Sequence, residues 1–277
     1  MKSISVICIT LFFLITSYPT KADIAINATP FDFATTLSFN SEVLHQVRSI
    51  NVYLTQNYEK NTGKHYPVIY LLDGSKNEDF IHIAGLVQFA NFSWIKMIPD
   101  TIVVGISNID RKHDFTTKSN NHFDQQELPS HGGAEQFIHF LQHELKPLIA
   151  KEYRTNGTET LIGQSLGGLL ATEILYNHSA LFDHYLIISP SLWWDDEALL
   201  KSQFKPNHPP KSVYIAVGKE GHVMERVAKE LYKQLALSLK DKSQVKFQFF
   251  SEHEHGDTLH LAQRHRLRAL SHRYNQQ

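Results

Sequence analysis

Unbroken apolar runs alternate along this chain with helical patterns, and that alternation restricts the folds open to it. Pro67–Leu72 and Thr101–Ile106 are apolar at nearly every position instead of every second one, which is typical of strands covered by helices on both faces. Farther along, Phe137, Leu141 and Leu145 recur every four residues and make one apolar helical stripe. Strands that alternate with helices predict an α/β fold with a mostly parallel central sheet and helices on both faces.

The same pattern continues along the chain and predicts further strands and helices. The expected strands are Ile50–Leu54, Pro67–Leu72, Thr101–Ser107, Glu159–Gly163, Tyr185–Ser189, Ser212–Val217 and Val245–Phe250. The expected helices cover residues 134–153, 166–178, 224–239 and 258–272. Residues 112–133 are polar and show little periodicity, so we expect a long loop above the sheet, of the kind that often sets specificity.

The first 22 residues have the features of a secretory signal peptide. Lys2 precedes an apolar run over residues 4–15, which is too short to span a membrane because a spanning helix needs about 20 apolar residues. Cleavage after Ala22 would leave a single domain over residues 23–277, periplasmic or secreted, with no membrane span. The alternative is an N-terminal anchor that is not cleaved.

Composition and charge exclude several classes of protein. With 42% hydrophobic residues and a formal net charge of −1, the chain is neither disordered nor strongly basic. We therefore expect no nucleic-acid partner. The one cysteine, Cys8, lies in the expected signal peptide, so a disulfide scaffold is excluded as well.

One motif carries chemistry. Gly163-Gln-Ser165-Leu-Gly167 stands between an expected strand and an expected helix, which is the context of a nucleophile elbow. Ser165 would occupy a strained turn that lifts its hydroxyl out of the sheet. The helix that begins at Leu166 would point its amide end at the reacting centre, where negative charge develops. The alternative is a Gly-Ser turn that merely ends a strand.

The base of such a site should follow the last strand, because the chain order here is serine, acid, histidine. Two histidines, His253 and His255, follow the strand expected over residues 245–250. His255 precedes Gly256, which permits a tight turn toward the serine. We therefore expect His255 to be the base, with His253 as the alternative.

The acid should follow the preceding strand, expected over residues 212–217. Glu220 comes next in the chain, and its role would be to hold the imidazole tautomer and stabilise the imidazolium. Glu225 and Asp257 are alternatives. A solvated surface carboxylate is the non-functional interpretation of Glu220.

The reaction also needs two preorganised donors for the oxyanion. The first candidate is the amide of Leu166, directly after the serine. The second is an amide at Gly74 or Ser75, in the loop that ends the strand over residues 67–72. Such a site needs no metal and no cofactor, and its partner is a small-molecule ester.

Several motifs together resemble a known family. They are Tyr66–Gly74, Ile102–Ile106 leading to Asn108-x-x-Arg111-x-x-Asp114, Gly163–Gly168 and Ser189–Asp195. In this order they resemble the putative esterase (esterase D-like) family of α/β-hydrolases, and within it the periplasmic siderophore esterases that hydrolyse trilactones such as enterobactin, salmochelin and bacillibactin.

The resemblance implies an α/β-hydrolase fold and a carboxylic ester hydrolase with Ser165 as nucleophile and His255 as base. The acid is the least uniform member of such sites, and some siderophore esterases work with a Ser–His pair alone. Here Gly218–Gly221 is shorter than the expected Gly-x-x-Glu form, so the resemblance supports Glu220 less strongly than the other two.

The resemblance also implies that Arg111, Trp193 and Trp194 line the substrate mouth. Arg111 would contact an anionic catecholate or carboxylate, and the two indole rings would stack on an aromatic acyl group. The structural alternatives are a salt bridge between Arg111 and Asp114 and plain packing of the tryptophans in the core.

Three other functions compete with a siderophore esterase. The same residues could serve a general carboxylesterase, thioesterase or peptidase, or a siderophore-binding protein without catalysis. The pattern His253-x-His255-x-Asp257-x-x-His260 superficially resembles a dinuclear metallohydrolase motif. That interpretation leaves Gly163–Gly168 without a role.

Overall fold

The computed structural model of the chain describes residues 26–265. The expected signal peptide over residues 1–22 and the last part of the helix expected over 258–272 lie outside the described residues. Residues 33–265 belong to one compact unit, and residues 26–32 belong to a separate N-terminal unit, in which they form neither helix nor strand. The domain start at residue 23 stays a prediction.

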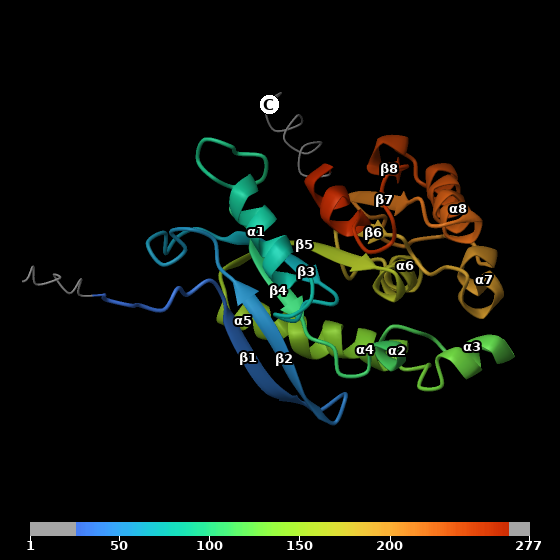
Figure 1. The fold of residues 1–277 in the computed structure, drawn as a ribbon, viewed down its shortest axis with the longest axis horizontal. Coiled ribbons are helices and arrows are strands. Elements are labelled where there is room, and N and C mark those ends of the chain that lie inside the picture. The colour runs from blue at the N-terminus through green and yellow to red at the C-terminus, as the bar shows by residue number, and fades with distance from the viewer. Residues whose placement is uncertain (1–25, 266–277) are drawn as a thin grey trace, which may run out of the picture. The chain divides into compact units, whose positions relative to one another are not determined.

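An eight-stranded sheet forms the centre of the compact unit (Figure 1), in the order β1-β2-β4-β3-β5-β6-β7-β8. The strands are β1 (Thr35–Ser41), β2 (Gln46–Tyr53), β3 (Tyr66–Leu71), β4 (Ile102–Ile106), β5 (Thr155–Gln164), β6 (His184–Ile188), β7 (Ser212–Gly218) and β8 (Val245–Phe250). β1 and β2 pair antiparallel at one edge, and the other six strands are parallel to one another. The predicted mostly parallel sheet is confirmed.

Helices cover both faces of the sheet, as the alternating pattern predicts. They are α1 (Phe80–Ala90), α2 (Arg111–Asp114), α3 (His122–Glu127), α4 (Ala134–Phe140), α5 (Lys146–Glu152), α6 (Leu166–Asn177), α7 (Trp194–Lys201) and α8 (His222–Ser238), with a further helix described over 258–265. A π-helical turn, η1 (Leu141–Leu145), joins α4 to α5, so the helix expected over 134–153 is continuous. A short 3₁₀ turn, η2 (Lys242–Gln244), precedes β8.

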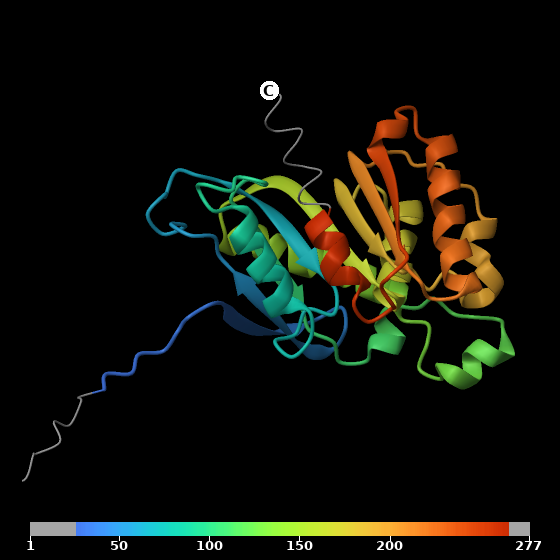
Figure 2. The same ribbon diagram turned by 45° about the horizontal axis from the view of Figure 1, so that its top comes forward.

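Two apolar clusters, one on each face, hold these layers together. Val68 and Tyr70 of β3 pack with α4, α6 and α8, whereas Ile69 and Leu71 pack with α1 and with the helix that contains Leu259. Successive residues of a strand point to opposite faces, so a run that is apolar throughout supplies both cores. Figure 2 shows α1 and the helix 258–265 beside each other on one face of the sheet.

Several elements differ from the sequence-based expectation, and α7 is one of them, since no helix was expected over its residues. β1 was not expected, because this edge strand is largely exposed and lacks an apolar run. α1 was not expected either, although it supplies Phe80, Ile83 and Val87 to the core. Residues 112–133, expected to be a loop, include most of α2 and all of α3.

The order of the sheet brings four distant loops to one edge. Ser165 follows β5, Ser189 follows β6, Glu220 follows β7 and His255 comes after β8. These strands are neighbours and parallel, so their carboxyl ends meet at the same edge, where α/β proteins place their sites.

Candidate active site

Ser165 lies in a strained turn between β5 and α6. Its backbone angles are φ 59° and ψ −120°, a region that residues other than glycine rarely adopt and that is frequent at functional sites. Its N–H donates to the carbonyl of Ile188 at 3.0 Å, and its own carbonyl accepts the N–H of Ser191 at 3.1 Å. Contacts on both sides therefore hold the turn in place.

Gly163 allows this turn to be as tight as it is. A Cβ at position 163 would lie 2.2 Å from the carbonyl oxygen of Gly167, a distance that no side chain tolerates. At Gly167 the nearest atom, a carboxylate oxygen of Asp73, would be 3.3 Å away. Of the two glycines in the motif, Gly163 is therefore the one that the close approach of β5 and α6 requires most.

Ser165, Glu220 and His255 line one pocket of about 520 Å³. Its other lining residues are Ser191, Trp193, Lys219, Met224 and Glu254. The Ser165 hydroxyl oxygen lies 3.4 Å from that of Ser191. The structure thus brings together three residues that are far apart in the sequence.

His255 and Glu220 form a close pair in this pocket. The imidazole Nδ1 lies 2.5 Å from Glu220 Oε2. The Glu220 side chain is 2% exposed and the His255 side chain 46%, so the carboxylate is covered while the ring remains accessible. The ring of His253 instead packs against Phe250, with 6.0 Å between the ring centroids. His255 is therefore the histidine that meets the carboxylate.

The environment of Glu220 favours its ionised form. Burial raises the pKa of this carboxyl, but hydrogen bonds from His255, from the Ser189 hydroxyl and from the Gly218 amide outweigh burial and hold the pKa below its usual value. Glu220 is therefore a carboxylate at neutral pH, able to hold the Nδ1 proton and stabilise an imidazolium.

The alternative acids are engaged elsewhere. Glu225 accepts the amide of Gly221 at 3.1 Å, and Asp257 accepts the amide of Glu254 at 2.8 Å. Both carboxylates therefore stabilise local turns.

The predicted oxyanion donors differ in whether their N–H groups are already hydrogen-bonded within the protein. The Leu166 amide stands in the first turn of α6, where an N–H has no acceptor within its helix. The Gly74 amide donates to the Ile106 carbonyl at 2.9 Å, so Gly74 is not a free donor and that prediction is wrong. The Ser75 amide donates to the Glu78 carboxylate at 3.1 Å, so it could serve only after Glu78 moves away.

Arg111 braces the serine turn. Its guanidinium binds both oxygens of Asp73, at 2.6 and 2.9 Å, and donates to the carbonyl of Gln164 at 3.2 Å. These contacts use Nε and Nη2, and Arg111 is not among the residues that line the Ser165 pocket, so the expected substrate contact is not supported. The alternative partner, Asp114, is also wrong, because Asp114 pairs with the buried Arg48 at 2.9 Å.

The two tryptophans have separate environments. Trp193 lines the Ser165 pocket, as predicted. Trp194 is buried, donates its indole N–H to the Thr117 carbonyl at 3.2 Å, and lines a different cavity of about 230 Å³. Only Trp193 is therefore placed to meet a substrate, and core packing explains Trp194.

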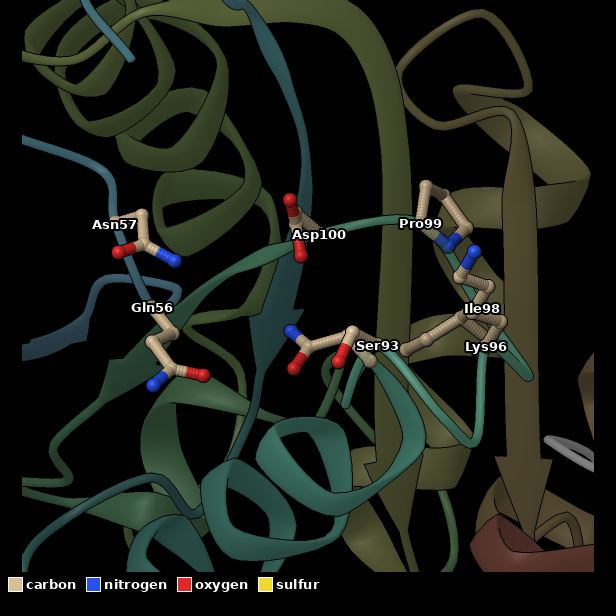
Figure 3. Close-up of a pocket in the computed structure, with 8 residues that line it drawn as sticks. Gln56, Asn57, Ser93, Lys96, Ile98, Pro99 and Asp100 are labelled. Atoms are coloured by element: carbon tan, nitrogen blue, oxygen red, sulfur yellow. The ribbon is translucent and has the colours of Figure 1, made fainter. Parts of the chain in front are cut away.

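A second pocket, of about 490 Å³, lies at the other edge of the sheet (Figure 3). Asp100 precedes β4, and Gln56 follows β2, which is antiparallel to β4. This pocket therefore opens where the parallel strands begin, whereas Ser165 lies where they end. Figure 3 shows the polar side chains of Gln56, Asn57 and Ser93 around it, and its lining includes no histidine. The candidate ester site is the pocket at Ser165.

The structure does not support the metallohydrolase motif. Within residues 26–265, no group of three or more His, Cys, Asp or Glu side chains is arranged to hold a metal ion. His255 faces Glu220, and the ring of His260 lies against that of His82, with 3.9 Å between the centroids.

No helix within residues 26–265 is long and apolar enough to cross a membrane.

Several residues of the site were missed by sequence reasoning. Lys219, Met224 and Glu254 line the Ser165 pocket, and no residue pattern marks them. Ser189 contacts Glu220. A signal for Ser189 existed, because it ends an expected strand at the same edge of the sheet as the serine motif.

Comparison with known proteins places this site in a family. The family model described as "Putative esterase" matches residues 41–264, a range that includes every residue of the site. The chain belongs to this family. As a member with the expected fold, it is a carboxylic ester hydrolase of the α/β-hydrolase type.

Individual relatives agree with the family. The esterase is 32% identical over 229 residues to the ferri-bacillibactin esterase BesA of Bacillus subtilis (strain 168), a match that covers 75% of this chain and 79% of the relative. An IroE-like serine hydrolase from Shewanella oneidensis is 29% identical, with a TM-score of 0.70, and covers 85% of this chain and 79% of its own.

Two further solved structures resemble the esterase. The BES protein from Bacillus cereus has a TM-score of 0.72 at 26% identity and covers 90% of this chain and 99% of its own. The siderophore hydrolase EstA from Aspergillus nidulans also has a TM-score of 0.72, at 21% identity, over 89% and 98% of the two chains. The EstA match concerns the fold alone.

Proposed function

We propose that this esterase hydrolyses its substrate with Ser165 as nucleophile, His255 as general base and Glu220 as the acid that orients the base. The observation that carries the proposal is the 2.5 Å contact between His255 Nδ1 and Glu220 Oε2 in the pocket that Ser165 lines. A buried carboxylate on one side of an imidazole and a serine near it form the arrangement that activates a weak alcohol nucleophile.

Acylation begins when the Ser165 hydroxyl turns from Ser191 toward the free nitrogen of His255. The serine oxygen attacks the ester carbon while His255 Nε2 takes the proton, and Glu220 stabilises the imidazolium that forms. The Leu166 amide donates to the oxyanion. His255 then returns the proton to the leaving alcohol, and the carbon–oxygen bond of the ester breaks.

Hydrolysis of the acyl-serine completes the cycle. A water molecule attacks the acyl carbon while the same imidazole removes its proton, and the proton is then delivered to the Ser165 oxygen as the carboxylic acid leaves. The water molecule and the three side chains account for every proton that moves in this step.

We further propose that the substrates are siderophore esters. The relative BesA is named for a ferri-siderophore ester, and Trp193 offers an indole face at the pocket for an aromatic acyl group. The alternative is a general carboxylesterase or thioesterase for small acyl groups, which the same catalytic residues could serve.

A substrate panel separates these alternatives. We expect kcat/KM for a catecholate trilactone such as bacillibactin or enterobactin to exceed that for p-nitrophenyl acetate and for a short acyl thioester by about 100-fold or more, since binding energy from the remote parts of the correct substrate raises the rate. Product release followed by chromatography gives the ratio. Faster turnover of the short esters would point to the general carboxylesterase.

We also propose that the protein is exported with residues 1–22 as a cleaved signal peptide, on the apolar run that follows Lys2. N-terminal sequencing of the exported protein is expected to begin at Asp23. A mature protein that begins at Met1 or Lys2 would indicate the uncleaved anchor.

A further inference from the structure

Ser189 is a buried polar residue at the edge of the candidate site that the mechanism does not yet use. It directly follows β6, is fully buried, and has a positive φ of 44°. Its N–H donates to the carbonyl of Ala216 on β7 at 2.7 Å. A non-glycine residue in this backbone region is strained, and such strain is maintained only where surrounding contacts hold it.

The Ser189 hydroxyl forms a hydrogen bond with the Glu220 carboxylate. It donates to Glu220 Oε1 at 2.5 Å, and the Gly218 amide donates to the same oxygen at 2.8 Å. Thr258 is also within reach, at 3.3 Å, but its hydroxyl lies 2.6 Å from the Glu254 carbonyl, and one proton cannot serve both acceptors well. Ser189 therefore supplies the main side-chain donor to this inner oxygen.

The two oxygens of Glu220 thus have separate tasks. Oε1 is held by Ser189 and Gly218, and Oε2 is left to meet His255 at 2.5 Å. Because the carboxylate is almost completely covered, no water replaces a lost donor at low cost. The direction in which Oε2 points depends on the contacts to Oε1.

We propose that Ser189 is a positioning residue of the active site, whose hydroxyl aims Glu220 at His255. The proposal rests on the proposed assignment of Glu220 and His255. Ser189 lies behind Glu220 and is not among the residues that line the Ser165 pocket, whereas Glu220 is, so Ser189 acts through Glu220 and not on the substrate.

The kinetic consequence follows from where Ser189 acts. Ser189 is not among the residues that line the Ser165 pocket, so loss of its hydroxyl should slow the chemical step and leave substrate binding unchanged. A fall in kcat without a change in KM is therefore the expected signature of a positioning role.

Two variants remove the hydroxyl with opposite effects on the backbone. Ser189→Ala keeps the strain of a positive φ, whereas Ser189→Gly relieves it. On p-nitrophenyl acetate we expect kcat to fall about 10- to 100-fold in both, the range seen when a partner that orients a functional histidine is lost in metal sites. KM should not change in either variant.

Thr101→Val is the matched control. Thr101 is also buried and donates its hydroxyl to a backbone carbonyl, that of Pro99, at 2.7 Å. It lies at the beginning of β4, at the edge of the sheet away from Ser165. We expect its kcat and its KM to equal those of the wild type.

Glu220→Gln, measured alone and combined with Ser189→Gly, separates the two proposals. Glu220→Gln should lower kcat about 10²- to 10⁴-fold, and adding Ser189→Gly should cost much less than it does in the wild type, because the two act through one contact. Wild-type activity in Glu220→Gln would refute the assignment of the acid itself. If Glu220→Gln is impaired, a wild-type kcat in Ser189→Gly, whatever the state of Ser189→Ala, would refute the positioning role alone.

Discussion

Replacing Ser165 by alanine should lower kcat/KM for p-nitrophenyl acetate about 10⁴-fold or more, to the rate that binding and the oxyanion donor alone can support. Within residues 26–265 its hydroxyl makes one hydrogen bond, a long one of 3.4 Å with the Ser191 hydroxyl. Its loss should therefore leave the fold intact, which circular dichroism and thermal unfolding can check.

Ser191→Ala is the appropriate control for this variant. It removes the same hydroxyl contact from the other side while leaving the nucleophile in place. We expect a loss of less than about tenfold, since the Ser191 amide, which donates to the Ser165 carbonyl, is unchanged. Substantial turnover by Ser165→Ala would overturn the serine mechanism.

Replacing His255 by alanine should have an effect of similar size, because the nucleophile and its base act as one unit. The structure offers a matched control two residues away. His253 follows the same strand, but its ring packs on Phe250, and its contact with the acid loop is made by its backbone carbonyl, which accepts the Lys219 amide at 2.6 Å. His253→Ala should therefore retain activity within about tenfold.

The pair of histidine variants decides which imidazole is the base. An inactive His253→Ala together with an active His255→Ala would reverse the assignment. If both variants stay active in the same ester assay, the contact between His255 and Glu220 has no catalytic role.

Much of the sheet could be predicted because its strands are buried on both faces. Pro67–Leu72 and Thr101–Ile106 are apolar on both faces, which predicts strands covered by helices on both sides. They correspond to β3 and β4, which lie in the interior of the sheet. β1 escaped prediction because an edge strand is half exposed and its sequence need not be apolar. The remaining strands matched to within a few residues.

The donors and ligands around the site were harder to predict, because a local motif does not reveal long-range partners. Gly74 follows β3 as expected, yet its amide bonds to Ile106, a residue brought beside it by the parallel pairing of β3 with β4. Arg111 carries the charge that would attract an anionic substrate, yet its Nε and Nη2 groups bind the two oxygens of Asp73. In each case an internal partner satisfies the group.

The sequence alone was enough to predict a largely parallel sheet flanked by helices, because apolar periodicity is a local property. It was also enough to place Ser165 in a turn between a strand and a helix, because the spacing of the glycines is local as well. Only the tertiary structure brought His255, which the turn at Gly256 already favoured over His253, against Glu220, and placed Ser189 behind that carboxylate. Those contacts join residues 31 to 35 positions apart, and they arise where neighbouring parallel strands end together, which depends on the order of strands in the sheet.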